Sequence, residues 1–252
     1  MSVHEDPPQL GGTQTVPASA GHPRVAVAVL AGGSGTRLGS EVLKPFLTVF
    51  GHPLIHYSLR VFEAIPEVAA IRVAIPETHG LALERVLASY PKRAYRGWTP
   101  GGATRPQSAL NALKALEADR PDVVLLHDAA RPLLQEEDVH ALLRALPGHD
   151  GAFLAAPSVD TLWRAEGASG TGTLDRRGLV RAFTPQAFPY DVVREAYEKG
   201  LAEGFEGTDD ASYVRHRGGD VVWVPGSRLN IKVTYPEDVD LVEAILRGQG
   251  CA

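Results

Sequence analysis

Alternation between two kinds of segment is the feature of this 252-residue sequence that most restricts its fold. From Arg24 onward, short apolar runs rich in β-branched residues alternate with longer segments whose apolar residues recur at helical spacing. Short runs of this kind are typical of buried strands, and their alternation with helices is typical of βαβ units. The sequence therefore predicts an α/β, Rossmann-like fold with a mostly parallel sheet covered by helices on both faces.

The pattern gives residue ranges for these elements. The predicted strands are Val25–Leu30, Val68–Ile75, Val123–Leu126, Gly151–Pro157 and Val221–Val224. The predicted helices are Leu54–Ile65, Gly80–Tyr90, Arg105–Leu116, Glu136–Leu146, Val192–Leu201 and Pro236–Leu246. Ligands bind beyond the carboxyl ends of the strands in such sheets, so a site is expected in the loops that follow the strands.

Two segments fall outside this alternation. Residues 1–24 carry no apolar core of a secretory signal, and we expect them to be a disordered tail. Between Ser158 and Arg181 the periodicity is lost, and a Gly/Ser/Thr-rich centre lies between two extended-looking stretches. Because long irregular segments in compact domains are usually functional or disordered, we interpret residues 158–182 as a protruding hairpin arm on a single domain of residues 25–249.

Composition limits the possible partners. The net charge is −5, which argues against a general nucleic-acid binder, so any anion site must be a local cluster of cations. No apolar run approaches the ~18 residues that a membrane-spanning helix needs. The lone Cys251 excludes an intrachain disulfide and fits a reducing compartment. We therefore expect a cytoplasmic protein that binds neither nucleic acid nor membrane.

A glycine-rich loop, Ala31–Gly35, follows the first predicted strand and precedes the cations Arg37 and Lys44. The third glycine of a dinucleotide fingerprint would stand at Leu38, and no Gly-Lys-Ser/Thr closes a P-loop, so neither motif applies. Glycines let backbone amides approach phosphate oxygens, and the two cations would neutralise several negative charges. The loop fits a polyanion site, and it equally fits an ordinary glycine-rich turn with two solvated cations.

Two later loops carry polar side chains. HDAARP (His127–Pro132) directly follows a predicted strand, so Asp128 could hold a metal or a sugar hydroxyl and Arg131 an anion. Taken alone, a helix cap and a surface salt bridge explain these two residues as well. GGATRPQSA (Gly101–Ala109) precedes a helix and suits either close backbone approach to a flat ring or a plain capped loop.

Segments spread over nearly the whole chain carry a family resemblance. In order from Leu30 to Thr234 they are LAGGSGTRLG…LKPFL, GGATRPQSA, HDAARP, APSVDTLWR, LDRRGLVRAFTPQAF, TDDAS and NIKVT. Together they resemble the 2-C-methyl-D-erythritol 4-phosphate cytidylyltransferase family of the non-mevalonate isoprenoid route. The resemblance implies a Mg²⁺-dependent reaction of CTP with methylerythritol phosphate that releases pyrophosphate. It also implies a homodimer in which each arm reaches across to the neighbouring site.

The resemblance assigns roles to individual residues. The catalytic residues that it implies are Arg37, Lys44, Arg176 and Lys232. The nucleotide-binding residues are Leu30, Ala31, Gly32, Gly33, Gly35, Thr36, Gly102, Ala103, Arg105, Ser108 and Ala129. The residues that contact the sugar phosphate are Asp128, Arg131, Thr161 and Thr184, with Asp128 also a candidate to lie near the metal.

The chemistry agrees with the residues found. The nucleophile in this reaction is a phosphate oxygen that is already deprotonated at neutral pH, so no general base is required. Phosphoryl-type transfer depends on positioning and charge stabilisation, which accounts for cations and for the lack of a Ser/His/Asp or Cys/His arrangement.

Three alternatives remain at this stage. Ribitol 5-phosphate cytidylyltransferases often share the LAGG form of the loop, where methylerythritol enzymes often read Ala-Ala-Gly instead of Ala31-Gly32-Gly33. They tend, however, to have Ser-Val at Ala129-Ala130 and to lack the DRRGL pattern. Molybdenum-cofactor guanylyltransferases usually have an acidic residue where Leu43 precedes Lys44. A nucleotide sensor without catalysis is the third alternative, which a turnover assay decides.

Overall fold

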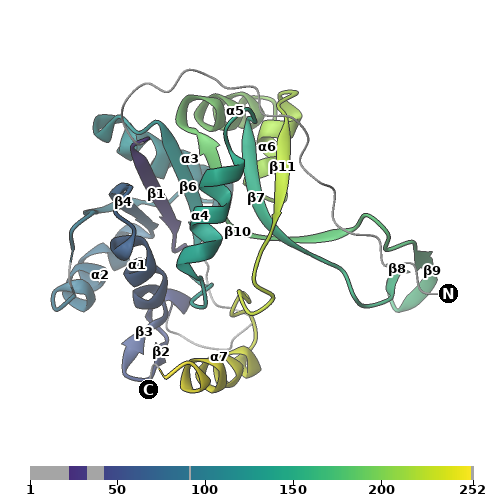
Figure 1. Cartoon of the computed structure of the whole chain (residues 1–252), viewed down its shortest axis with the longest axis horizontal. Helices are drawn as coiled ribbons and strands as arrows, with labels where there is room; N and C mark the ends of the chain where they lie inside the picture. The colour runs from purple at the N-terminus through teal and green to yellow at the C-terminus, as the bar shows by residue number, and fades with distance from the viewer. Residues whose placement is uncertain (1–22, 33–42, 91, 251–252) are drawn as a thin grey trace.

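A seven-stranded sheet lies at the centre of the computed structural model, which describes residues 23–32, 43–90 and 92–250 (Figure 1). In spatial order its strands are β11 (Val221–Pro225), β7 (Gly151–Pro157), β10 (Val180–Pro189), β6 (Val123–Asp128), β1 (Val25–Leu30), β4 (Val68–Ile75) and β5 (Tyr95–Pro100). Neighbouring strands are parallel except at β10, which runs antiparallel to both β6 and β7. The predicted α/β fold with a mostly parallel sheet is confirmed.

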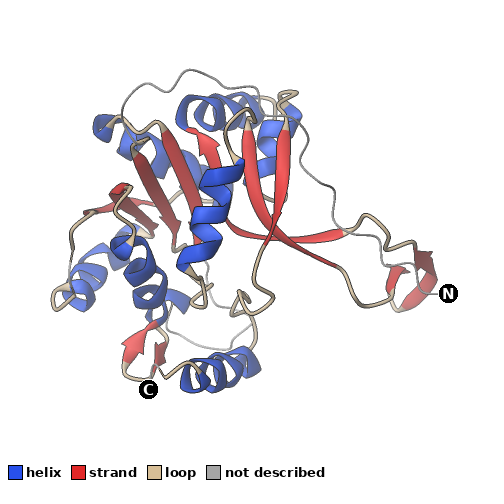
Figure 2. Ribbon diagram, in the orientation of Figure 1, coloured by secondary structure: helices blue, strands red, loops and turns tan. Residues whose placement is uncertain are grey.

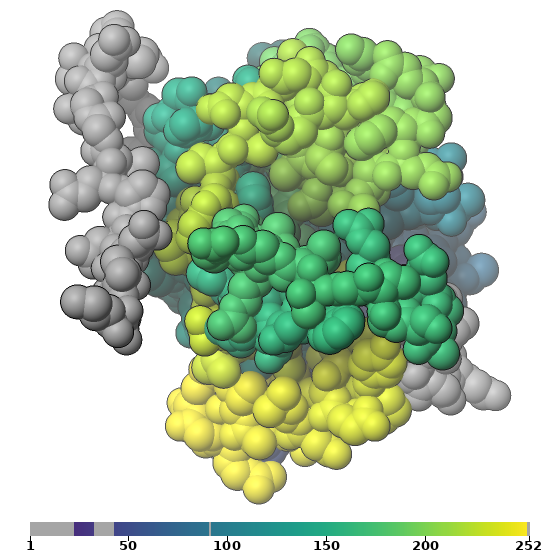
Figure 3. Space-filling model, turned by 90° about the vertical axis from the view of Figure 1, so that its right-hand side faces the viewer, coloured from purple at the N-terminus to yellow at the C-terminus, as the bar shows by residue number. Residues whose placement is uncertain are grey.

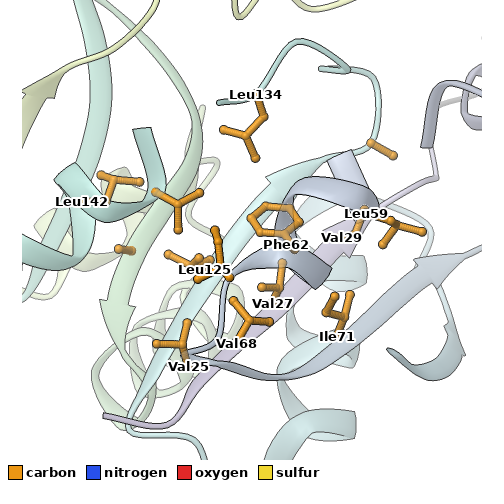
Figure 4. Close-up of a cluster of buried hydrophobic side chains, with 14 of the residues drawn as sticks. Val25, Val27, Val29, Leu59, Phe62, Val68, Ile71, Leu125, Leu134 and Leu142 are labelled. Atoms are coloured by element: carbon orange, nitrogen blue, oxygen red, sulfur yellow. The ribbon is translucent and has the colours of Figure 1, made fainter. Parts of the chain in front are cut away.

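Helices cover both faces of this sheet (Figure 2). One face packs against α1 (Leu54–Ala64), α2 (Gly80–Leu87) and α4 (Glu136–Ala145). The other packs against α3 (Arg105–Leu116), α5 (Tyr190–Ala202) and α6 (Asp210–His216). Because side chains alternate along a strand, the buried β1 contributes Val25, Val27 and Val29 to the first face and Ala26, Ala28 and Leu30 to the second. Figure 4 shows the first cluster, with Phe62 of α1 among the β-branched side chains.

A smaller layer lies at the end of the sheet where β1 finishes. It contains the short strands β2 (Thr48–Val49) and β3 (His52–Pro53) and the C-terminal helix α7 (Pro236–Gly248). Val242 and Leu246 of α7 pack in a third apolar cluster with Val49, Leu54 and Val233. Through Val233, this cluster anchors the segment before α7. That segment carries the predicted site residue Lys232. Three short 3₁₀ turns complete the described elements: η2 (Lys44–Phe46), η3 (Glu77–His79) and η4 (Glu117–Asp119).

The predicted hairpin arm is present as β8 (Leu162–Glu166) and β9 (Ser169–Leu174), which pair antiparallel. It projects away from the sheet in Figure 1 and lies across the front of the molecule in Figure 3. Its large apolar side chains face solvent within the chain: Val159, Trp163, Leu174 and Leu179 are 50%, 60%, 39% and 39% exposed. Because these side chains are poorly buried, packing within this chain contributes little to the stability of the arm.

Several predicted boundaries need correction. β6 continues to Asp128, α2 ends at Leu87 rather than Tyr90, and α5 starts at Tyr190 rather than Val192. The strands β5 and β10 were not predicted, and neither was α6, which begins at Asp210 within the polar stretch EGTDDAS. The expected tail falls largely on residues 1–22, which lie outside the described residues. No helix in the described ranges has the length and apolar character needed to span a bilayer.

Candidate active site

The predicted site residues of β1 and β6 meet at the carboxyl edge of the sheet. Leu30 pairs with Asp128 in the parallel ladder, so both strands end at the same level. The backbone N–H of Ala129 then donates to Leu30 O at 3.0 Å, and that of Ala31 donates to Ala74 O at 2.8 Å. These bonds hold both strand-to-loop turns in place, as expected for a ligand edge in an open α/β sheet.

Asp128 is the centre of the charged groups at this edge. Its Oδ1 accepts from Arg105 Nε at 3.1 Å, and its Oδ2 accepts from Lys232 Nζ at 2.8 Å. Its backbone N–H donates to Thr184 Oγ1 at 3.0 Å. Burial alone would raise the pKa of Asp128, but Arg105 and Lys232 outweigh burial and hold that pKa well below its usual range. Asp128 is therefore an ionised carboxylate between two cations, and both cations keep partly exposed side chains.

Arg105, in the first turn of α3, makes a second contact on its other side. Its Nη1 and Nη2 donate to the two carboxylate oxygens of Asp210 at 2.7 and 3.0 Å. Asp210 is fully buried and also accepts from the hydroxyl of Tyr197. Sequence reasoning missed Asp210 as an individual residue. The signal was the acidic pair Asp209–Asp210 in a polar stretch, but that pattern does not say which carboxylate turns inward.

The segment Asn230–Thr234, which carries Lys232, borders the site on the side of Asp128 away from Arg105. Arg131 Nη1 donates to Asn230 O at 2.7 Å, and the buried Asn230 Nδ2 donates to Thr184 O at 2.9 Å. Lys44 Nζ donates to Val233 O at 3.2 Å and to Thr234 O at 3.5 Å. The structure therefore brings the predicted residues Lys44, Arg131 and Thr184 to the segment that carries Lys232. Asn230 was not singled out from the sequence because its role depends on contacts distant along the chain.

The second glycine loop lies beside the first. Thr104 caps α3 by accepting from Gln107 N–H at 3.3 Å, and Ser108 Oγ accepts from Gly102 N–H at 3.0 Å. A Cβ added at Gly102 would lie 2.3 Å from Gln107 Cβ, so this tight turn requires glycine. A Cβ added at Gly32 would lie 3.7 Å from Ser108 Oγ, which places the two loops in contact range. Ala103, which is exposed, lies between Gly102 and the cap residue Thr104.

His127 precedes Asp128 on β6 and packs in the core beneath the charged groups. It is fully buried, and its ring meets Phe62 edge-on with 5.3 Å between centroids. Burial lowers the pKa of His127 to about 3, against the opposing effect of the adjacent Asp128. The imidazole is therefore neutral around pH 7 and adds no positive charge to the site.

Some predicted residues are not brought to this edge. Thr161 and Arg176 are exposed on the arm, where Arg176 donates to the backbone oxygen of Val159. The arm of the same chain points away from the sheet (Figure 1). Four predicted residues of the first glycine loop lie outside the described residues: Gly33, Gly35, Thr36 and Arg37.

A separate apolar cavity is a less suitable candidate for the ligand site than the edge around Asp128. It has a volume of about 260 Å³ and lies between α1, α2 and the start of β5, where His56 and Tyr90 line it. None of the predicted site residues belongs to its lining. The charged edge around Asp128, rather than this cavity, suits a polyanionic ligand.

Comparisons with known proteins agree on one family. The family model described as 2-C-methyl-D-erythritol 4-phosphate cytidylyltransferase matches residues 25–248. A relative with that name from Geotalea uraniireducens is 40% identical over 226 residues, which cover 89% of this chain and 97% of the relative. A solved structure with that name from Thermus thermophilus is 31% identical, with a TM-score of 0.73 and coverage of 89% and 99%. A 4-diphosphocytidyl-2C-methyl-D-erythritol synthase structure from Anaerococcus prevotii has a TM-score of 0.78 at 27% identity, with coverage of 90% and 100%.

Proposed function

The chain belongs to the 2-C-methyl-D-erythritol 4-phosphate cytidylyltransferase family, and from that premise we propose that the edge around Asp128 carries out the family's reaction. The protein transfers the cytidylyl group of CTP to 2-C-methyl-D-erythritol 4-phosphate, giving 4-(cytidine 5′-diphospho)-2-C-methyl-D-erythritol and pyrophosphate in non-mevalonate isoprenoid biosynthesis. The observation that carries this placement is the ionised Asp128 held between Arg105 and Lys232 where β1 and β6 end.

Charge stabilisation is the main chemical task at this edge. A phosphate oxygen of the acceptor forms a bond to the α-phosphorus of CTP, and the bond from that phosphorus to the pyrophosphate oxygen breaks. No proton needs to be removed from the nucleophile. Two polyanions must approach each other, and negative charge builds up around the α-phosphorus, so fixed cations lower the barrier. We assign that role to Lys44 and Lys232 at this edge, together with Arg37.

The nucleotide fits the two glycine loops. Their backbone amides and the short side chain of Ser108 allow close approach of a ring and of phosphates. The contact range between Gly32 and Ser108 supports one ligand that spans both loops. The residues proposed to bind CTP are Leu30, Ala31, Gly32, Gly102, Ala103, Arg105, Ser108 and Ala129, with Gly33, Gly35 and Thr36 from the loop outside the described residues.

We place the acceptor, methylerythritol phosphate, on the side of Asp128 where Lys232 and Arg131 lie. Asp128 is an ionised carboxylate and can accept hydrogen bonds from sugar hydroxyls, while Arg131 and Lys232 supply positive charge for the acceptor phosphate. The contact from Arg131 Nη1 to Asn230 O fixes the guanidinium plane and leaves further N–H donors. Thr184, which accepts from the Asp128 backbone, completes this set.

Mg²⁺ is proposed to enter with the nucleotide. The described residues contain no group of three or more His, Cys, Asp or Glu that could hold a metal ion. Both oxygens of Asp128 already accept from cations, so the carboxylate makes a weak resident metal ligand. Mg²⁺ commonly keeps several waters and binds substrate phosphates, so the phosphates of CTP would be its main ligands here. When bound, the ion would supply neutralisation of triphosphate charge.

A homodimer accounts for the exposed arm. Trp163 and Leu174 leave a large part of their apolar surface in solvent, and a second copy of the chain would cover it. The same arrangement would bring Thr161 and Arg176 to the partner's acceptor side, where their own chain does not place them.

Complementation between two impaired variants tests the shared site. We expect Lys44→Ala and Arg176→Ala each to lose most pyrophosphate release with CTP, Mg²⁺ and methylerythritol phosphate. In a mixed dimer, the Arg176→Ala body pairs with an intact arm, so one of the two sites is restored. After random subunit exchange the activity should rise to about a quarter of wild type, because about half of the dimers are mixed.

The matched control combines Lys44→Ala with Lys232→Met, two body residues, and should show no recovery. Differently tagged subunits show whether the two variants have exchanged subunits. If they have, and the activity of the Lys44→Ala and Arg176→Ala mixture stays at the level of the separate variants, arm exchange is contradicted. Light scattering at low micromolar concentration checks the dimer itself, and a monomer with full activity would refute it.

A further inference from the structure

We propose that Asp210 is a positioning residue that orients Asp128 through the guanidinium of Arg105. The inference rests on the proposed role of Asp128 in binding the acceptor. Nothing in the comparisons assigns Asp210 a part in the reaction. It would act without touching substrate, because its side chain is completely buried.

The geometry of Arg105 carries this inference. Its fork spans two carboxylates, with Nη1 and Nη2 on Asp210 at 2.7 and 3.0 Å and Nε on Asp128 at 3.1 Å. A two-point contact fixes the plane of a guanidinium, whereas a single contact leaves it free to rotate. The direction in which Nε points is therefore set from the Asp210 side.

Alternating charge extends this arrangement to the acceptor. In order, the groups are the Asp210 carboxylate, the Arg105 guanidinium, the Asp128 carboxylate and the Lys232 ammonium. Asp210 offsets one unit of the positive charge around Asp128. Without it, Arg105 would be drawn more strongly to Asp128 and would compete with sugar hydroxyls for the same oxygens.

Asp210 itself is rigidly held. The adjacent Asp209 caps α6 by accepting from Ser212 N–H at 2.9 Å. The buried Gln186 of β10 donates from Nε2 to Asp209 Oδ2 at 3.0 Å and accepts from Ala211 N–H at 2.8 Å. The Tyr197 hydroxyl also donates to Asp210. Contacts on both flanks of Asp210 fix the carboxylate, as a support for an active-site group requires.

Asp210→Asn is the direct test. The change keeps the shape and removes the charge, so Arg105 should lose its fixed orientation. Steady-state pyrophosphate release should show KM for methylerythritol phosphate rising by tenfold or more, up to about 10²-fold, since a well-oriented hydrogen bond to a charged group contributes this much to binding. Because Arg105 is also proposed to bind CTP, KM for CTP should rise too, but by clearly less than KM for methylerythritol phosphate, a split that general loosening of the fold would not produce.

Tyr213→Phe serves as the matched control. It removes a buried hydroxyl contact to Phe205 O from the same core without touching Asp210 or Arg105. Its KM values should match wild type even if its melting temperature falls. The proposal would be overturned if the ratio of KM for methylerythritol phosphate to KM for CTP were the same in Asp210→Asn, Tyr213→Phe and wild type.

A second variant keeps the test valid if Asp210→Asn folds poorly. Arg105→Met leaves Asp210 buried without its cation, whereas Arg105→Met with Asp210→Asn removes both charges and should be the more stable of the two. If Asp210 acts through Arg105, the double variant should have the same KM for methylerythritol phosphate as Arg105→Met. A further rise of the size seen for Asp210→Asn alone would exclude this route.

Asp128→Asn separates this inference from the proposed function. No turnover of methylerythritol phosphate by wild type would contradict the function itself. Turnover by wild type with an unchanged acceptor KM in Asp128→Asn would contradict the acceptor role of Asp128. An acceptor KM raised in Asp128→Asn and unchanged in a folded Asp210→Asn would contradict only the positioning role.

Discussion

Replacing Lys44 by alanine is expected to slow pyrophosphate release by about 10²–10³-fold while CTP binding stays measurable. The ammonium group is buried at the start of η2 and donates to the backbone oxygens of Val233 and Thr234. These contacts hold a cation beside the segment that carries Lys232. Charge that develops at the α-phosphate would lose a fixed partner, whereas the glycine loops proposed to bind the nucleotide would remain.

The measurement is kcat in steady state together with CTP affinity by calorimetry. Lys92→Ala is the control, because Lys92 lies at the surface, where it contacts Glu84 at 3.9 Å and the Tyr95 ring, and should leave kcat unchanged. Lys44→Arg keeps the charge and should retain more activity than Lys44→Ala. A Lys44→Ala protein with wild-type kcat would remove this residue from the catalytic account.

Lys232→Met is expected to reduce kcat/KM for methylerythritol phosphate by about 10²–10³-fold. The substitution removes one of the two cations on Asp128 and, with it, the charge proposed to face the acceptor phosphate. The methionine retains most of the apolar stem, so the fold should persist. The loss should appear for the acceptor, with a smaller change for CTP.

Lys199→Met provides the comparison, because Lys199 is exposed in the last turn of α5, outside the proposed site. Its kinetic constants should equal those of wild type. If Lys232→Met instead raises only the KM for CTP, the two substrates occupy the edge in the opposite order to the one proposed.

Much of the fold could be predicted from the pattern of apolar residues. β1, β4 and β7 are apolar throughout or nearly so and largely buried, and their predicted ranges match the structure. β10 was missed because Pro185 interrupts its sequence and its register with β7 shifts between Ala182 and Gln186, a combination that weakens any strand signal. α6 was missed because it has seven residues and starts in a polar stretch.

The site was predictable only where local sequence and family resemblance pointed to it. Asp128 and Arg131 lie at and just beyond the end of a strand, a position that indicates the carboxyl edge of the sheet as the candidate site. Asp210 and Asn230 act through residues far away in the chain, Arg105 and Thr184, so their roles depend on the tertiary arrangement. Sequence periodicity contains no information about such pairings.

Pyrophosphate release with CTP and Mg²⁺, compared between methylerythritol 4-phosphate and ribitol 5-phosphate, tests the central claim most directly. The proposed function predicts release with methylerythritol phosphate and a much lower kcat/KM with ribitol phosphate. A preference for ribitol phosphate would keep the fold and the cation chemistry but contradict the acceptor. Release with neither sugar phosphate, despite CTP binding, would contradict the enzyme assignment itself.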